Sequence, residues 1–319
     1  MNRRDTKTNT GASLLRVAGN AASLLTTDVL NKATTFVLYA LVGRYLGAEA
    51  FGRFSLGLLL VYVFQGFASV GLPNLLTREI AQRIARAPRL LANGLVAASL
   101  TAVLAMLAMI ATAWLMRYDP TTTLVIVVLS FGLWPYAASQ VFEAGFRGTQ
   151  QMHFIALSNA VANTVKVIGG VWLLHQGFGI IELAALLVFV RVLILLTDAL
   201  LYFVWSGNRL VGWDRRYVRA LVRRSSTFLG IDAAIAGWSA VDALILSKFM
   251  SPLEVGLYSA ALQLLQPASL VYLSIVGSIF PAMCHRHRQV REQTHPPQLD
   301  TPAETALYAL TRWMVAFLL

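Results

Sequence analysis

Two stretches of the sequence share one pattern: RYLGAEAFGRFS at Arg44–Ser55 and KFMSPLEVGLYS at Lys248–Ser259. Aligned without a gap, each begins with a cation, an aromatic and an apolar residue, and each ends with glycine, any residue, an aromatic and serine. The same offset places Asp28 opposite Asp232, and both acids interrupt long apolar segments. A short motif that recurs together with an acid at a fixed distance indicates an internal repeat, although two short stretches can also agree by chance.

The apolar content of the chain is that of a membrane protein. Of its 319 residues, 57% are hydrophobic and 13% are charged, whereas an average soluble domain is roughly half apolar and about a quarter charged. The mean hydropathy is +0.64. Because no soluble fold of this length has enough interior to bury so much apolar surface, we predict an integral membrane protein.

Apolar segments long enough to cross a bilayer recur along the chain. A hydrocarbon core about 30 Å thick requires roughly 20 residues of helix. These segments lack the short alternating pattern of outer-membrane barrel strands, so the sequence predicts an all-α protein. Eight complete segments and the start of a ninth near Thr305 meet the length requirement: 14–42, 54–76, 90–116, 121–144, 154–175, 180–205, 226–250 and 255–283.

The cations are unequally divided between alternate connections. The N-terminal tail and the even-numbered connections hold most of them, whereas the odd-numbered connections hold only Arg44, Arg53 and Arg117. By the positive-inside rule this asymmetry predicts a cytoplasmic N-terminus, and it explains the net charge of +11 without a nucleic-acid partner. The predicted outer connections are short, at about 43–53, 117–120, 176–179 and 251–254.

The two copies of the repeated motif are separated by six predicted helices. An even number gives both copies the same orientation, as in transporters built from two parallel lobes around a central site. We therefore predict a cytoplasmic tail at 1–13, a first six-helix lobe at 14–205, a basic cytoplasmic linker at 206–225 and part of a second lobe at 226–319.

Several motifs resemble a known family. GRYLGAEAFGRFS from Gly43, GLPNLLTREIA from Gly71, FRGTQQM from Phe146 and SNAVANTVKV from Ser158 are similar to sequences of the polysaccharide-biosynthesis flippases. These are the Wzx-type members of the multidrug/oligosaccharidyl-lipid/polysaccharide (MOP) exporter superfamily. The resemblance continues through VDALILSKFMSPLEVGLYSAALQLLQP and IFPAM and covers about residues 14–283.

The resemblance implies a fold and a substrate. It implies a MATE-like, V-shaped helical transporter with two lobes, a cationic central cavity and a polyprenyl-pyrophosphate-linked oligosaccharide as its cargo. Family members usually contain more helices than this chain, so we expect a complete first lobe, a partial second lobe and a C-terminal truncation. A non-transporting fragment that acts as an assembly partner is an alternative.

Seven Asp, Lys and Arg residues lie inside the predicted spans and away from their ends. A charge at the bilayer centre costs several kcal/mol, so such residues normally face a cavity or a partner. Two pairs share a helix face and could neutralise themselves locally, one spaced by four residues and one by seven. In chain order the seven residues are Asp28, Lys32, Lys166, Arg191, Asp198, Asp232 and Asp242.

A pyrophosphate group requires cations away from bulk water, where the attraction is stronger. We predict that Lys32, Lys166 and Arg191 bind it, the arginine through its planar fork and the lysines as point charges. The four acids either bind a coupling H⁺ or Na⁺ or balance these cations: Asp28, Asp198, Asp232 and Asp242. No other cofactor, metal site or catalytic residue is expected, and we interpret Glu143 and Lys248 as anchors at helix ends.

The function predicted is transport rather than catalysis. The protein would flip a lipid-linked oligosaccharide from the inner to the outer leaflet of the bacterial inner membrane by alternating access, for O-antigen or exopolysaccharide synthesis. Its expected partners are that lipid, the membrane lipids and other polysaccharide-assembly proteins. One alternative is a multidrug or cation exporter, which calls for an acidic cavity. Another is a membrane glycosyltransferase or polymerase, which calls for a long outer loop.

Three prolines lie within predicted helices. Proline removes a backbone donor, so Pro73, Pro135 and Pro267 predict kinks at which the lobes bend. Membrane helices also tolerate proline without a functional reason.

Overall fold

A computed structural model of the chain describes residues 4–206, 210, 212 and 214–263, without the side chains of 4–26, 28, 205, 206, 226–240 and 243. Residues 1–265 form one compact unit. Its described part is helical throughout, as the sequence predicted. The elements are α1 (Arg4–Ser69), α2 (Leu72–Gln82), the 3-10 helix η1 (Ile84–Arg86), α3 (Ala87–Leu115), α4 (Pro120–Ser130), α5 (Leu133–Gly148), α6 (Met152–His175), α7 (Ile180–Ser206) and α8 (Arg215–Phe249). A further helical stretch covers residues 252–263.

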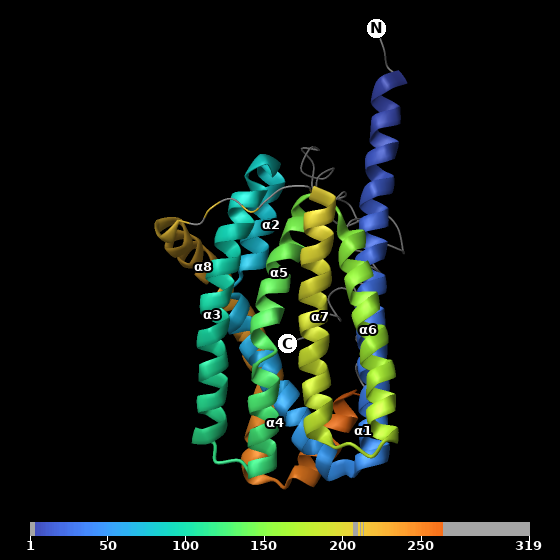
Figure 1. The fold of residues 1–319 in the computed structure, drawn as a ribbon, viewed down its shortest axis with the longest axis vertical. Coiled ribbons are helices and arrows are strands. Elements are labelled where there is room, and N and C mark those ends of the chain that lie inside the picture. The colour runs from blue at the N-terminus through green and yellow to red at the C-terminus, as the bar shows by residue number, and fades with distance from the viewer. Residues whose placement is uncertain (1–3, 207–209, 211, 213, 264–319) are drawn as a thin grey trace, which may run out of the picture. The chain divides into compact units, whose positions relative to one another are not determined.

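Helix α1 contains a sharp reversal at Gly47. The glycine has φ 83° and ψ 171°, while the residues on either side are helical. Only glycine adopts this backbone conformation without a steric clash. Figure 1 shows the chain descending through the first arm of α1 (residues 4–46), turning, and returning through the second arm (residues 48–69) towards α2. The predicted connection at 43–53 is therefore wrong in length, because a single glycine makes the turn.

Two predicted helices are interrupted before a proline. The helix expected at 54–76 ends at Ser69 and is followed by a left-handed pair, Val70 and Gly71, before α2. The helix expected at 121–144 is divided into α4 and α5. Proline cannot donate to the carbonyl four residues earlier, and counting back from Pro73 and Pro135 reaches Ser69 and Phe131, where the helices end or break. The kinks predicted at these two prolines are confirmed, whereas Pro267 lies outside the described residues.

Small side chains allow the helices to pack closely. Helix α3 buries a row of residues at helical spacing, Ala98, Ala102, Ala105, Met109 and Ala113. Helices α1 and α6 share an extensive contact, as do α3 with α5 and α6 with α7. Small residues at such interfaces let backbones approach closely in membranes, where packing replaces the hydrophobic effect as the main attraction.

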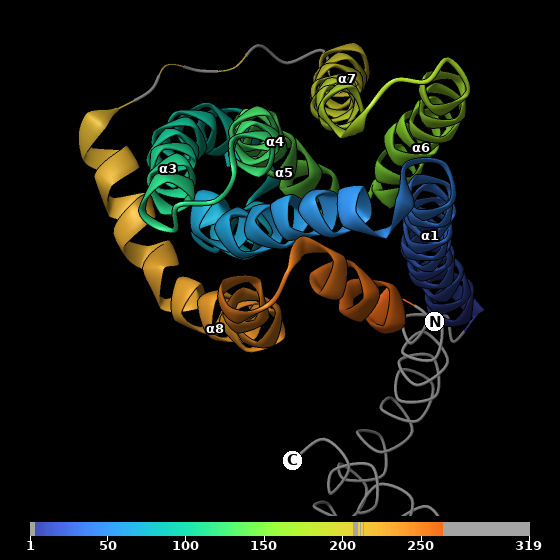
Figure 2. The ribbon, with the colours of Figure 1, turned by 90° about the horizontal axis from the view of Figure 1, so that it is seen from below.

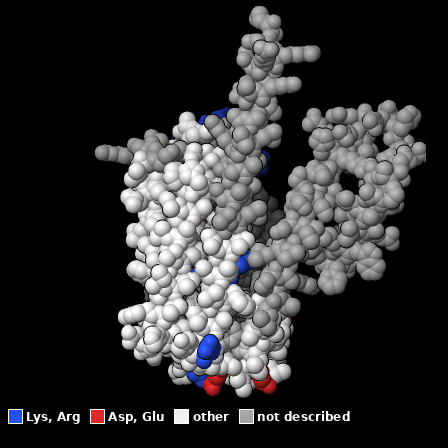
Figure 3. All heavy atoms as spheres, turned by 90° about the vertical axis from the view of Figure 1, so that its right-hand side faces the viewer, with Lys and Arg blue, Asp and Glu red and all other residues white. Residues whose placement is uncertain are grey.

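The surface of the bundle is suited to a lipid environment. Five stretches of described residues are long and apolar enough to cross a membrane: 29–69, 84–115, 120–148, 152–175 and 180–204. The first of them contains the reversal at Gly47 and so includes both arms of α1. Figure 3 shows that uncharged residues cover most of the described part of one face, with acidic side chains only at its lower end. The chain is a multi-pass membrane protein.

The connections are sorted between the two ends of the bundle. One end, here called the Gly47 end, holds the reversal in α1, the turn at 116–119 between α3 and α4, and the turn at 176–179 between α6 and α7 (Figure 1). The opposite end holds the arginine-rich α2–η1–α3 corner and the start of α8. Helix α8 begins at Arg215, so the last part of the predicted linker at 206–225 is helical. The division into lobes remains a prediction.

Candidate functional site

A cavity of about 410 Å³ lies within the helix bundle. Both arms of α1, helices α6 and α7, and the α4–α5 junction line it. Leucine, valine and isoleucine side chains make up much of the wall. The polar groups on which its chemistry depends come from Asn31, Thr35, Asn159, Asn163, Lys166 and Arg191.

Amide side chains join α1 to α6 along one wall of the cavity. Asn31 donates to the Asn159 Oδ1 at 3.4 Å and accepts from Asn163 Nδ2 at 2.6 Å. The hydroxyl of Thr34 donates to Asn163 at 2.9 Å. Asn159, Asn163 and Lys166 are spaced by four and three residues, so they share one face of α6. We did not predict the asparagines as site residues, although this spacing within SNAVANTVKV was the signal that could have found them.

Lys166 is one of the two predicted cations that the structure places on the cavity wall. Its side chain is buried, with 8% of the residue exposed, and its Nζ donates to the Thr35 hydroxyl at 3.2 Å. Among the described residues it has no ion pair with a carboxylate. An ammonium group has three donors, so it retains the capacity to bind a ligand in the cavity.

Arg191 is the second predicted cation on the wall. Its guanidinium carbon lies 4.9 Å from the centroid of the Tyr136 ring, within the range of a cation–π interaction. Gly132 at the α4–α5 junction lies against the arginine stem. The local pair that we considered with Asp198 does not form, because no ion pair joins them in the described part of the chain.

The remaining predicted residues lie elsewhere. Lys32 is on the first arm of α1, half-buried, and does not line the cavity. Asp242 is exposed on α8 and accepts a hydrogen bond from the Tyr258 hydroxyl at 2.8 Å. The side chains of Asp28 and Asp232 are outside the described part of the structure.

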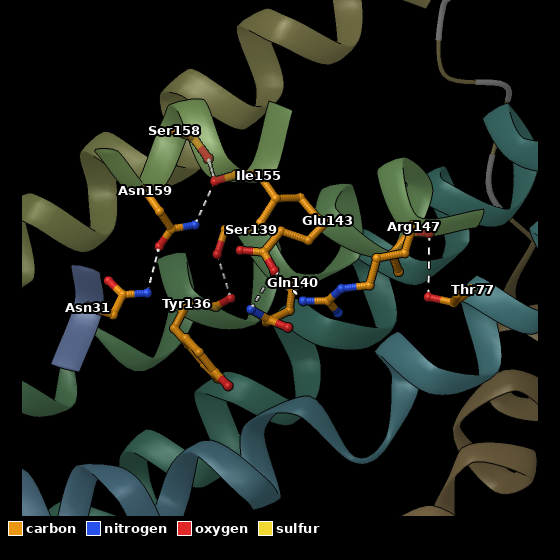
Figure 4. Close-up of polar contacts among 11 residues, drawn as sticks. Asn31, Thr77, Tyr136, Ser139, Gln140, Glu143, Arg147, Ile155, Ser158 and Asn159 are labelled. Carbon is orange, nitrogen blue, oxygen red and sulfur yellow. Dashed lines mark hydrogen bonds and ion pairs between the residues drawn. The ribbon is translucent and has the colours of Figure 1, made fainter. Parts of the chain in front are cut away.

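A buried carboxylate network lies among α5, α6 and α7, as Figure 4 shows around Glu143. The Glu143 Oε2 accepts from Arg147 at 2.6 Å and from Gln140 at 3.1 Å. Our interpretation of Glu143 as an anchor at a helix end is wrong. Helix α5 continues to Gly148, so Glu143 lies inside it with only 5% of its surface exposed.

Asp198 lies close to this network on α7. It is completely buried, and within the described residues neither carboxylate oxygen has a hydrogen-bond partner of good geometry. The Ser158 hydroxyl lies beside it but donates to the Ile155 carbonyl. A buried carboxylate without a partner is costly in its charged form.

Comparisons with known proteins identify the family and the fold. A family model described as polysaccharide biosynthesis protein matches residues 17–287. The fold is similar to that of a MOP superfamily transporter from Pyrococcus furiosus Vc1 (DSM3638), with a TM-score of 0.56 and 14% identity over 72% of this chain and 54% of that chain. It is also similar to the eukaryotic MATE transporter AtDTX14, with a TM-score of 0.55 and 12% identity over 83% of this chain and 60% of that chain.

The chain thus spans less than two thirds of either solved transporter. No curated protein sequence matches it. The family match covers most of the sequence, and the fold, the membrane-spanning helices and the transporter neighbours agree with it. The chain belongs to the polysaccharide biosynthesis protein family, and its fold is similar to that of MOP superfamily and MATE transporters.

Proposed function

We propose that this protein flips a polyprenyl-pyrophosphate-linked oligosaccharide across the bacterial inner membrane, from the inner to the outer leaflet. The observation that carries the proposal is the pair Lys166 and Arg191, two cations on the wall of one cavity in an apolar bundle. Neither forms an ion pair among the described residues. Both cations line the same cavity, so an anion bound there could contact both of them.

The electrostatics of the cavity support an anionic ligand. Hydrogen bonds between a phosphate and a charged side chain are strong, and they strengthen further where water is excluded. The volume of about 410 Å³ falls within the range of small-molecule sites, about 300–1,000 Å³. The cavity would hold the pyrophosphate, and the amides of Asn31, Asn159 and Asn163 would contact polar groups of the ligand.

The polarity of the cavity argues against the main alternative, a multidrug or cation exporter. A cation exporter requires an acidic cavity, but no aspartate or glutamate lines this one in the described part of the chain. For the Pyrococcus furiosus transporter, a reversed polarity of the binding pocket is described as pointing to a different function. By the same logic, a cationic pocket favours an anionic cargo here.

The acidic residues have a separate proposed role. Asp198, buried near the Glu143–Arg147 pair, is the described acid best placed to bind a coupling H⁺ or Na⁺, or to balance the nearby cations. Outward transport does not require a coupling ion. An inside-negative membrane potential favours the outward movement of negative charge, with a free energy of about 2.3 kcal/mol per charge per 100 mV. Resetting an empty cationic cavity is the step at which a coupling ion would help.

The test is surface polysaccharide in cells that carry the Lys166→Ala and Arg191→Ala variants. Each contact between a charged group and a hydrogen-bond partner contributes roughly 1.5–3 kcal/mol, so export at limiting substrate should fall about ten- to a hundredfold. Lys32→Ala is the matched control, since Lys32 does not line the cavity, and it should export normally. Export at the parent level from stable Lys166 and Arg191 variants would refute the proposal.

A further inference from the structure

The two copies of the repeated motif contact each other directly. Gly52, on the second arm of α1, faces the start of the helical stretch 252–263. A Cβ atom built on Gly52 would lie 1.8 Å from the Pro252 carbonyl oxygen and 2.8 Å from the Gly256 nitrogen. A Cβ built on Gly256 would lie 2.2 Å from the Ala48 carbonyl oxygen and 3.0 Å from the Gly52 nitrogen.

This contact is reciprocal. Each glycine faces the carbonyl four residues before the other glycine, and the two glycines are equivalent in the sequence repeat. Such reciprocity, with the same patch on both sides, is typical of a contact across a two-fold axis. Both obstructing atoms belong to the backbone, so no side-chain movement could make room for a larger residue. The repeated glycine is therefore explained by the approach of one copy to the other.

Polar contacts hold the end of α8 beside this contact. The Tyr118 hydroxyl and the Ser247 hydroxyl are 3.0 Å apart, joining the α3–α4 turn to α8. Lys248 donates to the Met116 carbonyl and lies 5.2 Å from the centroid of the Tyr118 ring. These groups are polar and close to the surface, so their contacts can exchange for contacts with water when the helices separate.

The contact lies next to the cavity, towards the Gly47 end. The nearest cavity-lining residue on the second arm of α1 is Leu58, six residues after Gly52 and so about 9 Å along the helix axis. Figure 2, viewed from below, shows the helical stretch 252–263 lying along this arm of α1. The same end holds the short turns 116–119 and 176–179.

We propose that Ala48, Gly52, Pro252 and Gly256 form a glycine seam that closes the Gly47 end of the transport path. The seam opens when α8 and the following helix move away from α1, and it closes when the two repeat copies dock on each other. Only the gating role that we assign to the seam depends on the proposed transport function. Its geometry stands without any assumption about the cargo.

Accessibility of the cavity tests the seam without a substrate. In a Cys284→Ser background, which removes the single native cysteine, Val61→Cys places a thiol on the cavity wall. A membrane-impermeant thiol reagent is then added on the side of the Gly47 end. Gly52→Ala or Gly256→Ala should raise the labelling rate several-fold, because the added Cβ keeps the helices apart. Gly43→Ala is the control, since nothing lies within 4 Å of its added Cβ.

Unchanged labelling in both seam variants, with protein that remains folded, would overturn the seam. Should those variants fail to fold, cross-linking provides the second test. Tyr118→Cys with Ser247→Cys, joined by a short cleavable reagent, should stop export until the link is cleaved. Ser99→Cys with Trp134→Cys, whose parent side chains are 3.2 Å apart between α3 and α5, is the control pair and should leave export unchanged.

Normal export from the cross-linked Tyr118–Ser247 variant would also overturn the seam. Failure of the proposed function has a different signature. No variant, including the parent before cross-linking, would then support export of a lipid-linked oligosaccharide, while the labelling difference between Gly52→Ala and Gly43→Ala would persist.

Discussion

At the scale of single residues, the buried charges differ in whether they form a close ion pair. Glu143 is paired with Arg147 at 2.6 Å, whereas Lys166 and Arg191 face a cavity and lack such a pair in the described residues. An ionised group in a bilayer is costly without a partner or a polar space. The paired charges therefore stabilise the bundle, and the two cavity cations are the ones available to a ligand.

Removing one partner of the buried pair should destabilise the protein. Glu143→Ala leaves Arg147 without its partner inside the bundle, and breaking a buried pair costs about 3–5 kcal/mol. Arg147 is partly exposed, so the lower end of that range is expected. The matched control is Glu49→Ala, which removes the exposed i,i+4 pair with Arg53 and should cost less than about 1 kcal/mol. Thermal unfolding in detergent measures both, and equal losses would show that Glu143–Arg147 is not a stabilising pair.

Asp119 gives the protein a pH dependence at the Gly47 end. Burial alone would raise the pKa of this carboxyl, but hydrogen bonds from the side chain and backbone of Thr122 and the charge of Arg53 outweigh burial and lower the pKa. The charged form is favoured in the folded state. Its stabilisation is present above the unfolded pKa of about 4 and is lost as the pH falls through the folded pKa.

Asp119→Ala tests this cap of α4. The carboxylate accepts from the Thr122 backbone nitrogen at 3.1 Å, and loss of such an N-cap costs about 0.5–2 kcal/mol. The difference in melting temperature between the parent and the variant should be present at pH 7 and should shrink below pH 4. A difference that stays constant across this range would contradict the assignment of the cap to the ionised carboxylate.

At the scale of helices, periodicity and length located the elements but not their exact ends. The turn at 176–179 agrees with the prediction because apolar residues stop on both sides of a glycine-containing stretch. The connection expected at 43–53 was too long because we assigned charged residues such as Arg44 and Arg53 to a loop. Both residues are helical in the structure. Charge alone cannot show whether a residue near a membrane surface ends a helix or continues it.

The candidate site was predictable only in part, because one sequence defines neither the rotation of a helix nor its exact ends. The apolar surroundings of Lys166 and Arg191 identified them. Lys32 has similar surroundings in the sequence, but the direction of its side chain depends on helix rotation, which one sequence does not define. Glu143 was misjudged because the end of α5 was placed too early.

Gly47→Ala tests the reversal of α1. An added Cβ at Gly47 meets nothing within 4 Å, and the same is true of Gly43. The two positions differ in backbone conformation, since Gly47 has φ 83° and a side chain there costs about 1–3 kcal/mol. Gly47→Ala should lower the unfolding temperature, whereas Gly43→Ala should leave it unchanged or raise it slightly, because alanine favours helix. Equal effects would argue against the strained turn.

At the scale of the whole molecule, the distribution of charge predicts orientation. The arginine-rich α2–η1–α3 corner and the start of α8 share one end, and the short turns share the other. By the positive-inside rule we expect the arginine-rich end to face the cytoplasm. The sequence predicted this alternation well because each span inverts the chain, so one missed helix would have reversed every later connection.

Single-cysteine labelling in the Cys284→Ser background tests the orientation. Arg83→Cys and Gln176→Cys place exposed thiols at opposite ends of the bundle. In spheroplasts, an impermeant reagent should label Gln176→Cys and not Arg83→Cys. In inside-out vesicles, it should label Arg83→Cys and not Gln176→Cys. The opposite pattern would invert the proposed direction of transport.

The central claim is that Lys166 and Arg191 hold a lipid pyrophosphate inside the bundle, and direct binding to the purified protein tests it most closely. The measurement is the affinity for a polyprenyl pyrophosphate, compared with the polyprenol of the same length that lacks phosphate. The parent and Lys32→Ala should prefer the pyrophosphate, and Lys166→Ala with Arg191→Ala should lose that preference by at least about tenfold. A double variant that binds the pyrophosphate as tightly as the parent would contradict the account.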